Sequence, residues 1–303
     1  MALPHPIAYQ GSKRRIASEI LGFFPPDLDR LVEPFAGSAA ITIAAAHKGK
    51  AKRFLINDLN VPLMELWREI IYAPERVASS YELLWNSQSG SERKYYDLVR
   101  DEFNRTHEPS HLLYLLARCV KAAVRYNSKG EFNQGPDNRR RGRNPERMRR
   151  EILAVADLLR DRVQIESVDF MEILGSVTST DLVYMDPPYQ GVSRDRDHRY
   201  LEHVDFKRFA QGLKVLNDRE VPFIVSYDGF TGSKSYGKSL PSSLELVHLV
   251  IDAGTSSQAT LLGRNARTLE SLYLSPFLIR QLKRHNLMCS LKSSEQPTLE
   301  DFA

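Results

Sequence analysis

The chain of 303 residues contains only two cysteines, Cys119 and Cys289, which lie far apart and form no CxxC pair. This usage argues against a disulfide framework and against a cysteine-ligated zinc site, and it fits a reducing cytosol. The eight histidines show no HExxH spacing either. We therefore expect no metal site in this protein.

Long hydrophobic runs are also missing. The apolar stretch LLYLLARCVKAAV is interrupted by Arg118 and Lys121, whereas a membrane-spanning helix needs about 20 consecutive apolar residues. The N-terminal residues MALPHPIAYQGSKRRI contain no apolar core of a signal peptide. We therefore expect a soluble, cytoplasmic protein that does not act at a membrane.

Charge is present but unevenly distributed. The formal net charge is only +4, yet the stretch NRRRGRNPERMRR, residues 138–150, holds seven arginines against one glutamate. Such runs are usually solvated loops. They also suit contact with the phosphates of a nucleic acid, and the composition alone leaves both interpretations open.

The pattern of apolar segments predicts an α/β fold. A short apolar strand at 30–35, a turn containing Gly37, a helix and a second strand at 52–57 form a βαβ unit, which implies a parallel sheet. Further strands are expected at 162–167, 181–185, 222–227, 244–250 and 269–274. The segment 206–218 reads as a crossover helix between two of them.

A long helical region interrupts this sheet. Between the second and third strands, apolar residues recur at helical spacing, then a polar Arg-rich loop follows, and a new helix begins at Pro145. An insertion of this length is too long for a loop. We expect a sheet domain at 1–60 and 160–280, a helical insertion at 61–159 and a polar C-terminal tail at 281–303.

Four features follow strands of the expected sheet, where α/β proteins bind their ligands. They are the turn EPFAGS at 33–38, Asp58, the pair Asp169-Phe170, and DPPY at 186–189. Asp58 suits a ribose, and Asp169-Phe170 suits an adenine ring and its amine. Each also has a structural alternative: a packed strand–helix turn, a helix N-cap, or a cap beside a core aromatic. The turn is not GxGxxG, so a dinucleotide site has little support.

The DPPY segment suits an amine that must become a nucleophile. The lone pair of an exocyclic amine is delocalised into its ring, so two acceptors for its N–H groups are needed to localise it. The carboxylate of Asp186 and the carbonyl of Pro187 supply two acceptors, and Pro187 with Pro188 fixes that carbonyl in advance. Tyr189 could stack on a base taken out of a duplex. A plain turn that ends a strand is the alternative.

Several motifs occur together and in a recognisable order. They are YQGSK at 9–13, EPFAGS, Asn57-Asp58, RYNSKGEFN at 125–133, DPPY, and GTSSQATLLGRNARTLESLYL at 254–274. In this order the chain resembles the DNA adenine-N6 methyltransferases of the DNA adenine methylase type, an α-class group of amino-methyltransferases. The resemblance spans most of residues 7–275.

The resemblance implies a Rossmann-like, S-adenosylmethionine-dependent methyltransferase sheet with an inserted helical target-recognition domain. It implies a site-specific, adenine-specific DNA methyltransferase that uses S-adenosylmethionine and double-stranded DNA. Its catalytic residues would be Asp186, Pro187, Pro188 and Tyr189. Its cofactor-binding residues would be Tyr9, Lys13, Glu33, Phe35, Ala36, Gly37, Ser38, Asp58, Asp169, Phe170 and Asp186, with Tyr9, Lys13 and Glu33 at the methionine end.

The resemblance also gives the arginine stretch a purpose, because the insertion would read the target. The expected DNA-binding residues are Arg125, Asn127, Lys129, Asn133, Arg139, Arg140, Arg141 and Arg143. After GEFN this chain continues QGPDNRRRGRNP, where relatives that read GATC tend to have a Pro-aromatic-Gly run. The residues that read bases therefore cannot be transferred, and GATC is one candidate target among others.

Other interpretations stay open at this point. An RNA or protein-glutamine amino-methyltransferase, a cytosine-N4 enzyme or a catalytically silent DNA-binding relative could carry a related motif. The motif of an RNA or protein-glutamine enzyme would more typically begin with Asn, and that of a cytosine-N4 enzyme with Ser, in place of Asp186. We expect a monomer of bacterial, archaeal or phage type, associated with the nucleoid, that works alone or beside a genetically linked restriction endonuclease.

Overall fold

The protein is built around one twisted sheet. The computed structural model describes residues 3–188, 204–231, 234–236, 239–255 and 267–285, so Tyr189 and the segment 256–266 lie outside it. Seven strands follow the order β3-β2-β1-β4-β5-β8-β7, and β6 pairs with β5 outside this path. Their bounds are β1 (Leu28–Glu33), β2 (Ala51–Asn57), β3 (Val163–Glu166), β4 (Asp181–Met185), β5 (Phe223–Thr231), β6 (Lys234–Tyr236), β7 (Val247–Thr255) and β8 (Arg267–Leu274).

Strand direction confirms the predicted α/β fold. The five strands from β3 to β5 along the sheet are mutually parallel, whereas β8 is antiparallel to both β5 and β7. The strand β4 is buried along its whole length. Such a strand reads as a continuous apolar run because helices cover the sheet on both faces.

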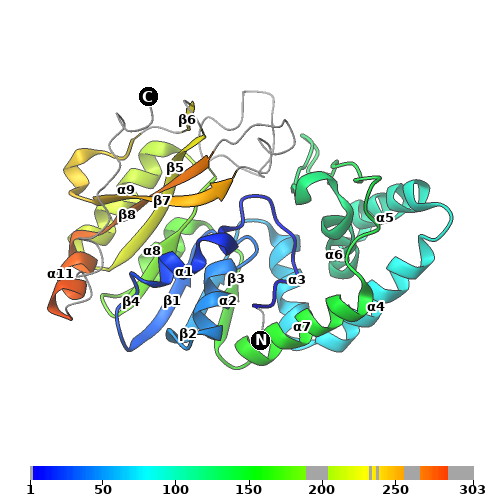
Figure 1. Cartoon of the computed structure of the whole chain (residues 1–303), viewed down its shortest axis with the longest axis horizontal. Helices are drawn as coiled ribbons and strands as arrows, with labels where there is room; N and C mark the ends of the chain where they lie inside the picture. Colours follow the sequence, from blue (N-terminus) through cyan, green and yellow to red (C-terminus); the bar gives the residue numbers. More distant parts are fainter. Residues whose placement is uncertain (1–2, 189–203, 232–233, 237–238, 256–266, 286–303) are drawn as a thin grey trace.

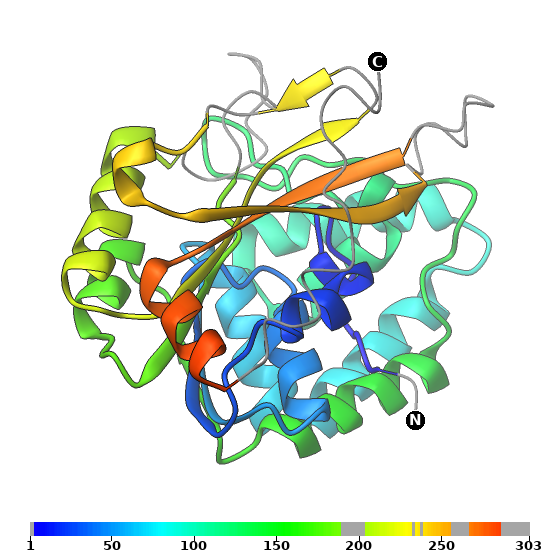
Figure 2. The ribbon, with the colours of Figure 1, turned by 60° about the vertical axis from the view of Figure 1, so that its left-hand side comes forward.

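The described helices alternate with these strands except in one long stretch. Their bounds are α1 (Ala17–Leu21), α2 (Ala40–His47), α3 (Val61–Tyr72), α4 (Pro74–Ser87), α5 (Glu92–Thr106), α6 (Pro109–Arg118), α7 (Pro145–Leu159), α8 (Phe170–Ser176), α9 (Phe206–Asp218) and α11 (Pro276–Arg284). Proline in the first turn starts α3, α4, α6, α7 and α11. Figures 1 and 2 show that α4, α5 and α6 lie beside the sheet rather than over it.

Alternate residues of each central strand point into two separate cores. In β4, Leu182 and Tyr184 join one core, and Val183 and Met185 join the other, as the two-residue period of a strand requires. The second core is closed by α8 and α9, and the first by α2, α3 and α7. Among the described helices, none has both the length and the apolar character needed to cross a bilayer.

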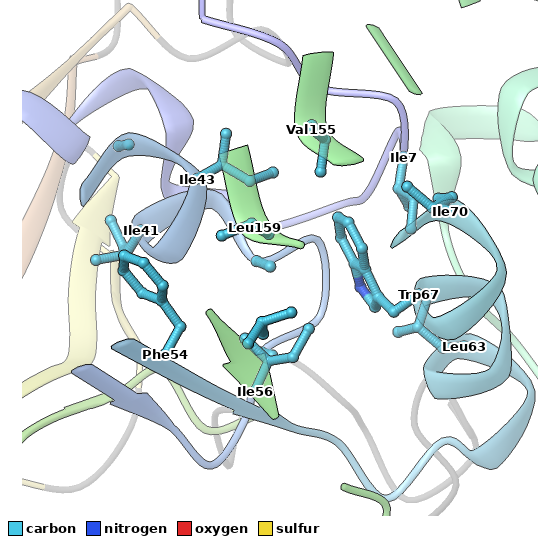
Figure 3. Close-up of a cluster of buried hydrophobic side chains, with 14 of the residues drawn as sticks. Ile7, Ile41, Ile43, Phe54, Ile56, Leu63, Trp67, Ile70, Val155 and Leu159 are labelled. Atoms are coloured by element: carbon cyan, nitrogen blue, oxygen red, sulfur yellow. The ribbon is translucent and has the colours of Figure 1, made fainter. Parts of the chain in front are cut away.

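The first and last helices of the expected insertion share the core of the sheet. Trp67 of α3 and Leu159 of α7 lie in the same buried cluster as Ile56 of β2 (Figure 3). The indole of Trp67 also donates a hydrogen bond of 2.9 Å to the carbonyl of Gly37, just after β1. The helices α4, α5 and α6 belong to the same buried cluster but pack mainly on α3, α7 and one another rather than on the strands.

The C-terminal boundary differs from the sequence prediction. Residues 281–284, assigned to a polar tail, form the end of α11, and Leu282 is buried. The segment PFLIRQLKR buries Leu278, Ile279 and Leu282 on one side, as expected for an amphipathic helix packed on a domain. The helix α11 thus extends into the first four residues of the segment that the sequence assigned to the tail.

Candidate active site

The strand order reverses at β1, which lies between β2 and β4. Because β1 and β4 are parallel neighbours, the segments that follow them leave the same edge of the sheet. A crevice outside the carboxyl ends of strands at such a reversal is where α/β proteins bind ligands. Here the reversal brings the EPFAGS turn next to the start of DPPY.

One cavity opens at this edge. It is lined by the N-terminal segment, the ends of β1, β2 and β4, the turn before α8 and the start of α9. Every described residue that the sequence assigned to the catalytic motif or the cofactor lines it: Tyr9, Lys13, Glu33, Phe35, Ala36, Gly37, Ser38, Asp58, Asp169, Phe170, Asp186, Pro187 and Pro188. Tyr189 lies outside the described residues, so its place is not assigned.

The turn after β1 is held tightly on both sides. Gly37 has a φ of +49°, and a Cβ added there would lie 3.0 Å from the ring of Tyr9. Its N–H donates to Asp58 Oδ2 over 3.0 Å. Glycine is therefore required for the backbone conformation and for the close approach of Tyr9.

Asp58 is not the cap of the following helix. That cap is Asn60, whose side chain accepts the N–H of Leu63 over 3.3 Å. Asp58 instead accepts N–H bonds from Gly37 and Asn60, each of 3.0 Å. Burial raises the pKa of Asp58, although these two bonds oppose the shift. Its carboxylate keeps acceptor capacity toward the cavity, which suits hydroxyl groups of a ligand.

Asn57 was paired with Asp58 in the sequence, but its structural role became visible only in the fold. Its amide donates to the carbonyls of Pro34 and Val168 over 3.0 and 3.1 Å, and its oxygen accepts the N–H of Val168 over 2.9 Å. These bonds tie the loops after β1 and β3 to the end of β2. Three walls of the cavity are thereby fixed by one buried side chain.

Lys13 meets the acid of the DPPY motif. Its ammonium lies 3.0 Å from Asp186 Oδ1 and 3.6 Å from Glu270 Oε2, and its side chain is only 7% exposed. Burial alone would lower the pKa of Lys13, but the two carboxylates outweigh it and raise that pKa above its usual range. The permanent positive charge stabilises the negative charge of Asp186. Glu270, on β8, had no signal in the sequence.

Glu33 is a buried acid in the same cavity. It is 2% exposed, and its carboxylate accepts the N–H of Thr42 in α2. Burial raises the pKa of Glu33 from its usual value of 4.5 to about 7, the bond from Thr42 opposes this shift, and the charge of Asp186 adds to it. A carboxylate in such a place is costly unless a cation comes to it.

This burial predicts a pH-dependent stability. The folded pKa of Glu33 lies above the unfolded one, so the stabilising contribution of the protonated acid is complete below pH 4.5 and is lost as the pH rises to about 7. Glu33→Gln should therefore become more stable relative to the wild type by about 2 to 3 kcal/mol between pH 5 and pH 8. Urea unfolding of the ligand-free proteins at both pH values measures this difference. The exposed Glu172→Gln is the control, and an equal change there would contradict the assignment to Glu33.

Asp169 and Phe170 are covered by an arginine that the sequence did not single out. Asp169 caps α8 by accepting the N–H of Met171, and Arg208 of α9 donates to both of its oxygens over 2.8 and 2.7 Å. The guanidinium also lies 5.3 Å from the centre of the Phe170 ring. Asp169 thus caps a helix, as the structural alternative predicted. Asp169 and Phe170 also line the cavity, as the cofactor interpretation predicted.

The comparisons with known proteins decide the family. Residues 9–253 match the family described as D12 class N6 adenine-specific DNA methyltransferase. The chain belongs to this family. It is therefore an enzyme that methylates N6 of adenine in DNA. This decides against the RNA, protein-glutamine and cytosine-N4 alternatives.

Named relatives of this adenine methyltransferase come from distant organisms. The retron Ec67 DNA adenine methylase of Escherichia coli is 31% identical over 226 residues, which cover 73% of this chain and 75% of that protein. The type II methyltransferase M1.LlaDCHI of Lactococcus lactis subsp. cremoris is 27% identical over 233 residues, with 72% and 78% covered. The type II methyltransferase M.MjaIII of Methanocaldococcus jannaschii is 24% identical over 266 residues, with 77% and 91% covered.

In this methyltransferase the segment after α6 forms a small hairpin beside the cavity. An isolated bridge pairs Tyr126 with Phe132. The side chain of Asn127 accepts the N–H groups of Lys129 and Glu131, so it shapes the turn. Tyr126 and its neighbour Val124 line the cavity. The hairpin therefore carries the exposed Lys129 and Asn133 close to the mouth of the site, while Asn127 is occupied within the turn.

The arginines that follow the hairpin differ in their surroundings. Arg139, Arg140 and Arg141 have side chains 77%, 60% and 48% exposed, and the first two pair with Asp137. Arg143 is only 21% exposed, pairs with Glu151 and donates to the carbonyl of His5. Arg143 thus ties the loop to α7 and to the N-terminal segment, and the other three present their guanidinium groups to solvent.

Proposed function

We propose that the cavity binds S-adenosylmethionine and that Asp186 and Pro187 present the amine of a target adenine to it. The observation that carries this proposal is the position of Asp186. It follows β4 at the strand reversal, beside the charged Lys13, and shares one cavity with the Gly37 turn and Asp58. No cluster of three metal-ligating side chains occurs among the described residues.

The polar groups of the cavity fit this cofactor in kind and in order. Asp58 offers carboxylate oxygens to the two ribose hydroxyls. Asp169 and Phe170 offer an acceptor and a ring to the adenine. At the other end, Glu33 is a buried acid with no cationic partner among the described residues, and an α-ammonium group would supply one. The bound cofactor supplies an electrophilic methyl group on a sulfonium centre.

The chain's own residues prepare the nucleophile. Asp186 accepts one N–H of the adenine amine, and the carbonyl of Pro187 accepts the other, which withdraws the nitrogen lone pair from the ring. Because Pro187 and Pro188 fix the backbone, no ordering is needed at the moment of reaction. Lys13 pairs with Asp186 and orients its carboxylate. Asp186 and Pro187 would hold the amine, the cofactor would supply the methyl group, and the surplus proton of the amine would pass to solvent.

The target adenine must leave the duplex to reach this cavity. The hairpin at 125–133 and the arginines at 139–141 are the proposed DNA contacts. The proposed catalytic and cofactor residues that the structure describes line one cavity, and the enzyme is proposed to act as a monomer. Two of the relatives are named type II methyltransferases, which favours a role in restriction–modification beside a cognate endonuclease.

Arg208 provides a test of the adenine end of the cavity. Its guanidinium covers Phe170 and occupies Asp169, so it must move when an adenine binds there. Arg208→Ala should therefore tighten S-adenosylmethionine binding about fivefold, the cost of breaking one exposed ion pair and one cation–π contact. Isothermal titration calorimetry measures this change. Lys214→Ala, on the same helix, is the control, and weaker binding by the Arg208 variant would contradict the assignment.

The overall proposal is tested in two steps. Titration of the purified protein with S-adenosylmethionine should show binding to one site per chain. Long-read sequencing of DNA from cells that express the protein should then show N6-methyladenine at one sequence. Failure to bind the cofactor, or DNA without N6-methyladenine, would overturn the proposal and would favour a silent DNA-binding relative.

A further inference from the structure

A buried polar cluster lies in the helical region, away from the cavity. Gln88, at the end of α4, is fully buried, and its amide donates to the carbonyls of Trp85 and Arg141 over 2.8 and 3.0 Å. Its oxygen accepts the hydroxyl of Tyr114 over 3.1 Å and the guanidinium of Arg118. All the hydrogen-bonding groups of this one side chain are therefore used.

The guanidinium in this cluster is costly for stability. Arg118 is only 2% exposed, and it has no carboxylate partner among the described residues. Its Nε has no hydrogen-bond partner either. Burying a cation in this way is unfavourable unless it is well compensated. A group retained at such a cost is better explained by the geometry it imposes than by the stability it adds.

That geometry is imposed on the arginine loop, which we define as residues 137–143. The carbonyl of Arg118 accepts the N–H of Asp137 over 2.8 Å, at the start of the loop. Gln88 holds the carbonyl of Arg141, as described above. The hydroxyl of Tyr81 donates to the carbonyl of Arg143 over 2.7 Å. The loop is thus held by hydrogen bonds at its beginning, near its middle and at its end.

Packing holds the loop at a fourth point. Gly142 has a φ of +87°, and a Cβ added there would lie 3.1 Å from the Tyr81 hydroxyl and 3.3 Å from Arg118 Cδ. The loop backbone therefore rests directly on the buried cluster. The side chain of Arg141 is also held by a cation–π contact, because its guanidinium lies 5.1 Å from the centre of the Trp85 ring.

On the exposed side of the loop, two arginine side chains are held in place by one carboxylate. Arg139 and Arg140 share the carboxylate of Asp137, to which both guanidinium groups donate hydrogen bonds. The hydrogen bonds of these arginines lower the pKa of Asp137 below its usual range. The backbone of the loop and the guanidinium groups of Arg139 and Arg140 are thus held in position before any DNA binds. A preorganised surface loses less conformational entropy on binding than a flexible one.

We propose that Gln88 is a positioning residue for target recognition, which holds the arginine loop in the shape that fits the target duplex. This inference rests on the proposed role of the loop as a DNA contact. A flexible arginine loop would still attract phosphates of any sequence, because that attraction depends on charge alone. Contacts with base edges depend on fixed positions. Gln88 therefore acts mainly on discrimination between sequences.

Two substitutions separate the hydrogen bonds of Gln88. Gln88→Glu keeps an acceptor for Arg118 and Tyr114 but removes the N–H groups that hold Arg141 and Trp85. Gln88→Met removes all four bonds at similar volume. Gln211→Glu, an exposed change on α9 with the same change in charge, is the control. If Gln88→Met does not fold, Gln88→Glu still supplies the test, because it retains a partner for the buried guanidinium.

The readouts distinguish this inference from the proposed function. Fluorescence anisotropy is measured with two unmethylated duplexes. The first carries the sequence that this enzyme methylates, and the second lacks it. We expect Gln88→Glu to lose about tenfold in affinity for the first duplex, as the loss of hydrogen bonds at one site implies, and at most about threefold for the second. S-adenosylmethionine binding should stay unchanged. Equal affinities of Gln88→Glu and the wild type for the target duplex would overturn the inference.

Hydrogen exchange tests the rigidity of the loop directly in the wild type. The amides of Asp137 and Arg140 donate to the carbonyls of Arg118 and Asp137, so both should be protected and should lose protection in Gln88→Glu. Exchange of these amides in the wild type at the rate of a free peptide would also overturn the inference. If the wild type bound no DNA, the proposed role of the loop as a DNA contact would be contradicted. The amide protection would still show whether Gln88 holds the loop.

Discussion

Replacing Asp186 by alanine should reduce methyl transfer about a thousandfold or more, because the amine loses the charged acceptor that localises its lone pair. S-adenosylmethionine binding should change little, since the ribose and adenine ends of the cavity are formed by Asp58, Asp169 and Phe170. Single-turnover transfer of labelled methyl groups to duplex DNA measures the first effect. Calorimetric titration measures the second. The expected pattern is thus a loss in rate without a loss in cofactor affinity.

Two further variants make this result specific. Asp186→Asn keeps an oxygen acceptor but loses the charge that pairs with Lys13, so its rate should fall between those of the wild type and the alanine variant. Lys13→Arg should retain more activity than Lys13→Met, because it restores a cation beside Asp186. Turnover of Asp186→Ala near the wild-type rate would refute the role assigned to this residue.

Changing Arg139, Arg140 and Arg141 together to glutamine should weaken DNA binding by a factor on the order of a hundred at moderate salt. The same variant should flatten the dependence of affinity on salt, by about one unit of slope for each arginine that contacts a phosphate. These side chains are exposed, but Arg139 and Arg140 pair with the buried Asp137, so a circular-dichroism spectrum equal to that of the wild type must first show that the variant keeps its fold. Fluorescence anisotropy across a series of salt concentrations measures both quantities.

The control for this variant removes the same charge elsewhere. Arg53, Arg76 and Arg280 are exposed and paired with carboxylates on other parts of the surface. Their joint replacement by glutamine lowers the net charge equally but leaves the arginine loop untouched. If both triple variants bind DNA alike, or if the loop variant keeps its affinity and salt slope, the loop is not the DNA contact.

The sheet and the segments at its edge could be predicted because their signals are local. The run DLVYM is apolar enough to be a buried strand, and the prolines at 187 and 188 cannot continue it, so the strand must end beside Asp186. The glycine of EPFAGS likewise marks a turn where only glycine fits. Each of these features depends on neighbours in the chain, which a sequence displays directly.

Residues whose roles depend on distant partners could not be predicted in this way. Arg208 belongs to an ordinary amphipathic helix, and only the fold places it on Asp169, 39 positions earlier in the chain. The role of Glu270 likewise depends on its ion pair with Lys13, and that of Gln88 on its hydrogen bond to the carbonyl of Arg141. The sequence suggested Asp58 as a possible cap of α3, but in the fold Asn60 caps that helix and Asp58 accepts the N–H of Gly37 instead.

The arrangement of α3 and α7 determines where a recognition module can be exchanged between relatives. Both helices lie on the sheet, and Trp67 of α3 supports the Gly37 turn through its indole. A chimaera joined at 61 and 159 would replace α3 and Trp67 along with the rest of the insertion, so this support of the Gly37 turn would be lost. Joints after Tyr72 and before Asn144 would keep this support and would transplant α4, α5, α6, the arginine loop and the hairpin at 125–133, including Tyr126 of the cavity wall. On the proposed role of this segment in reading the target, its divergence between these two seams would leave Trp67 and the Gly37 turn in place.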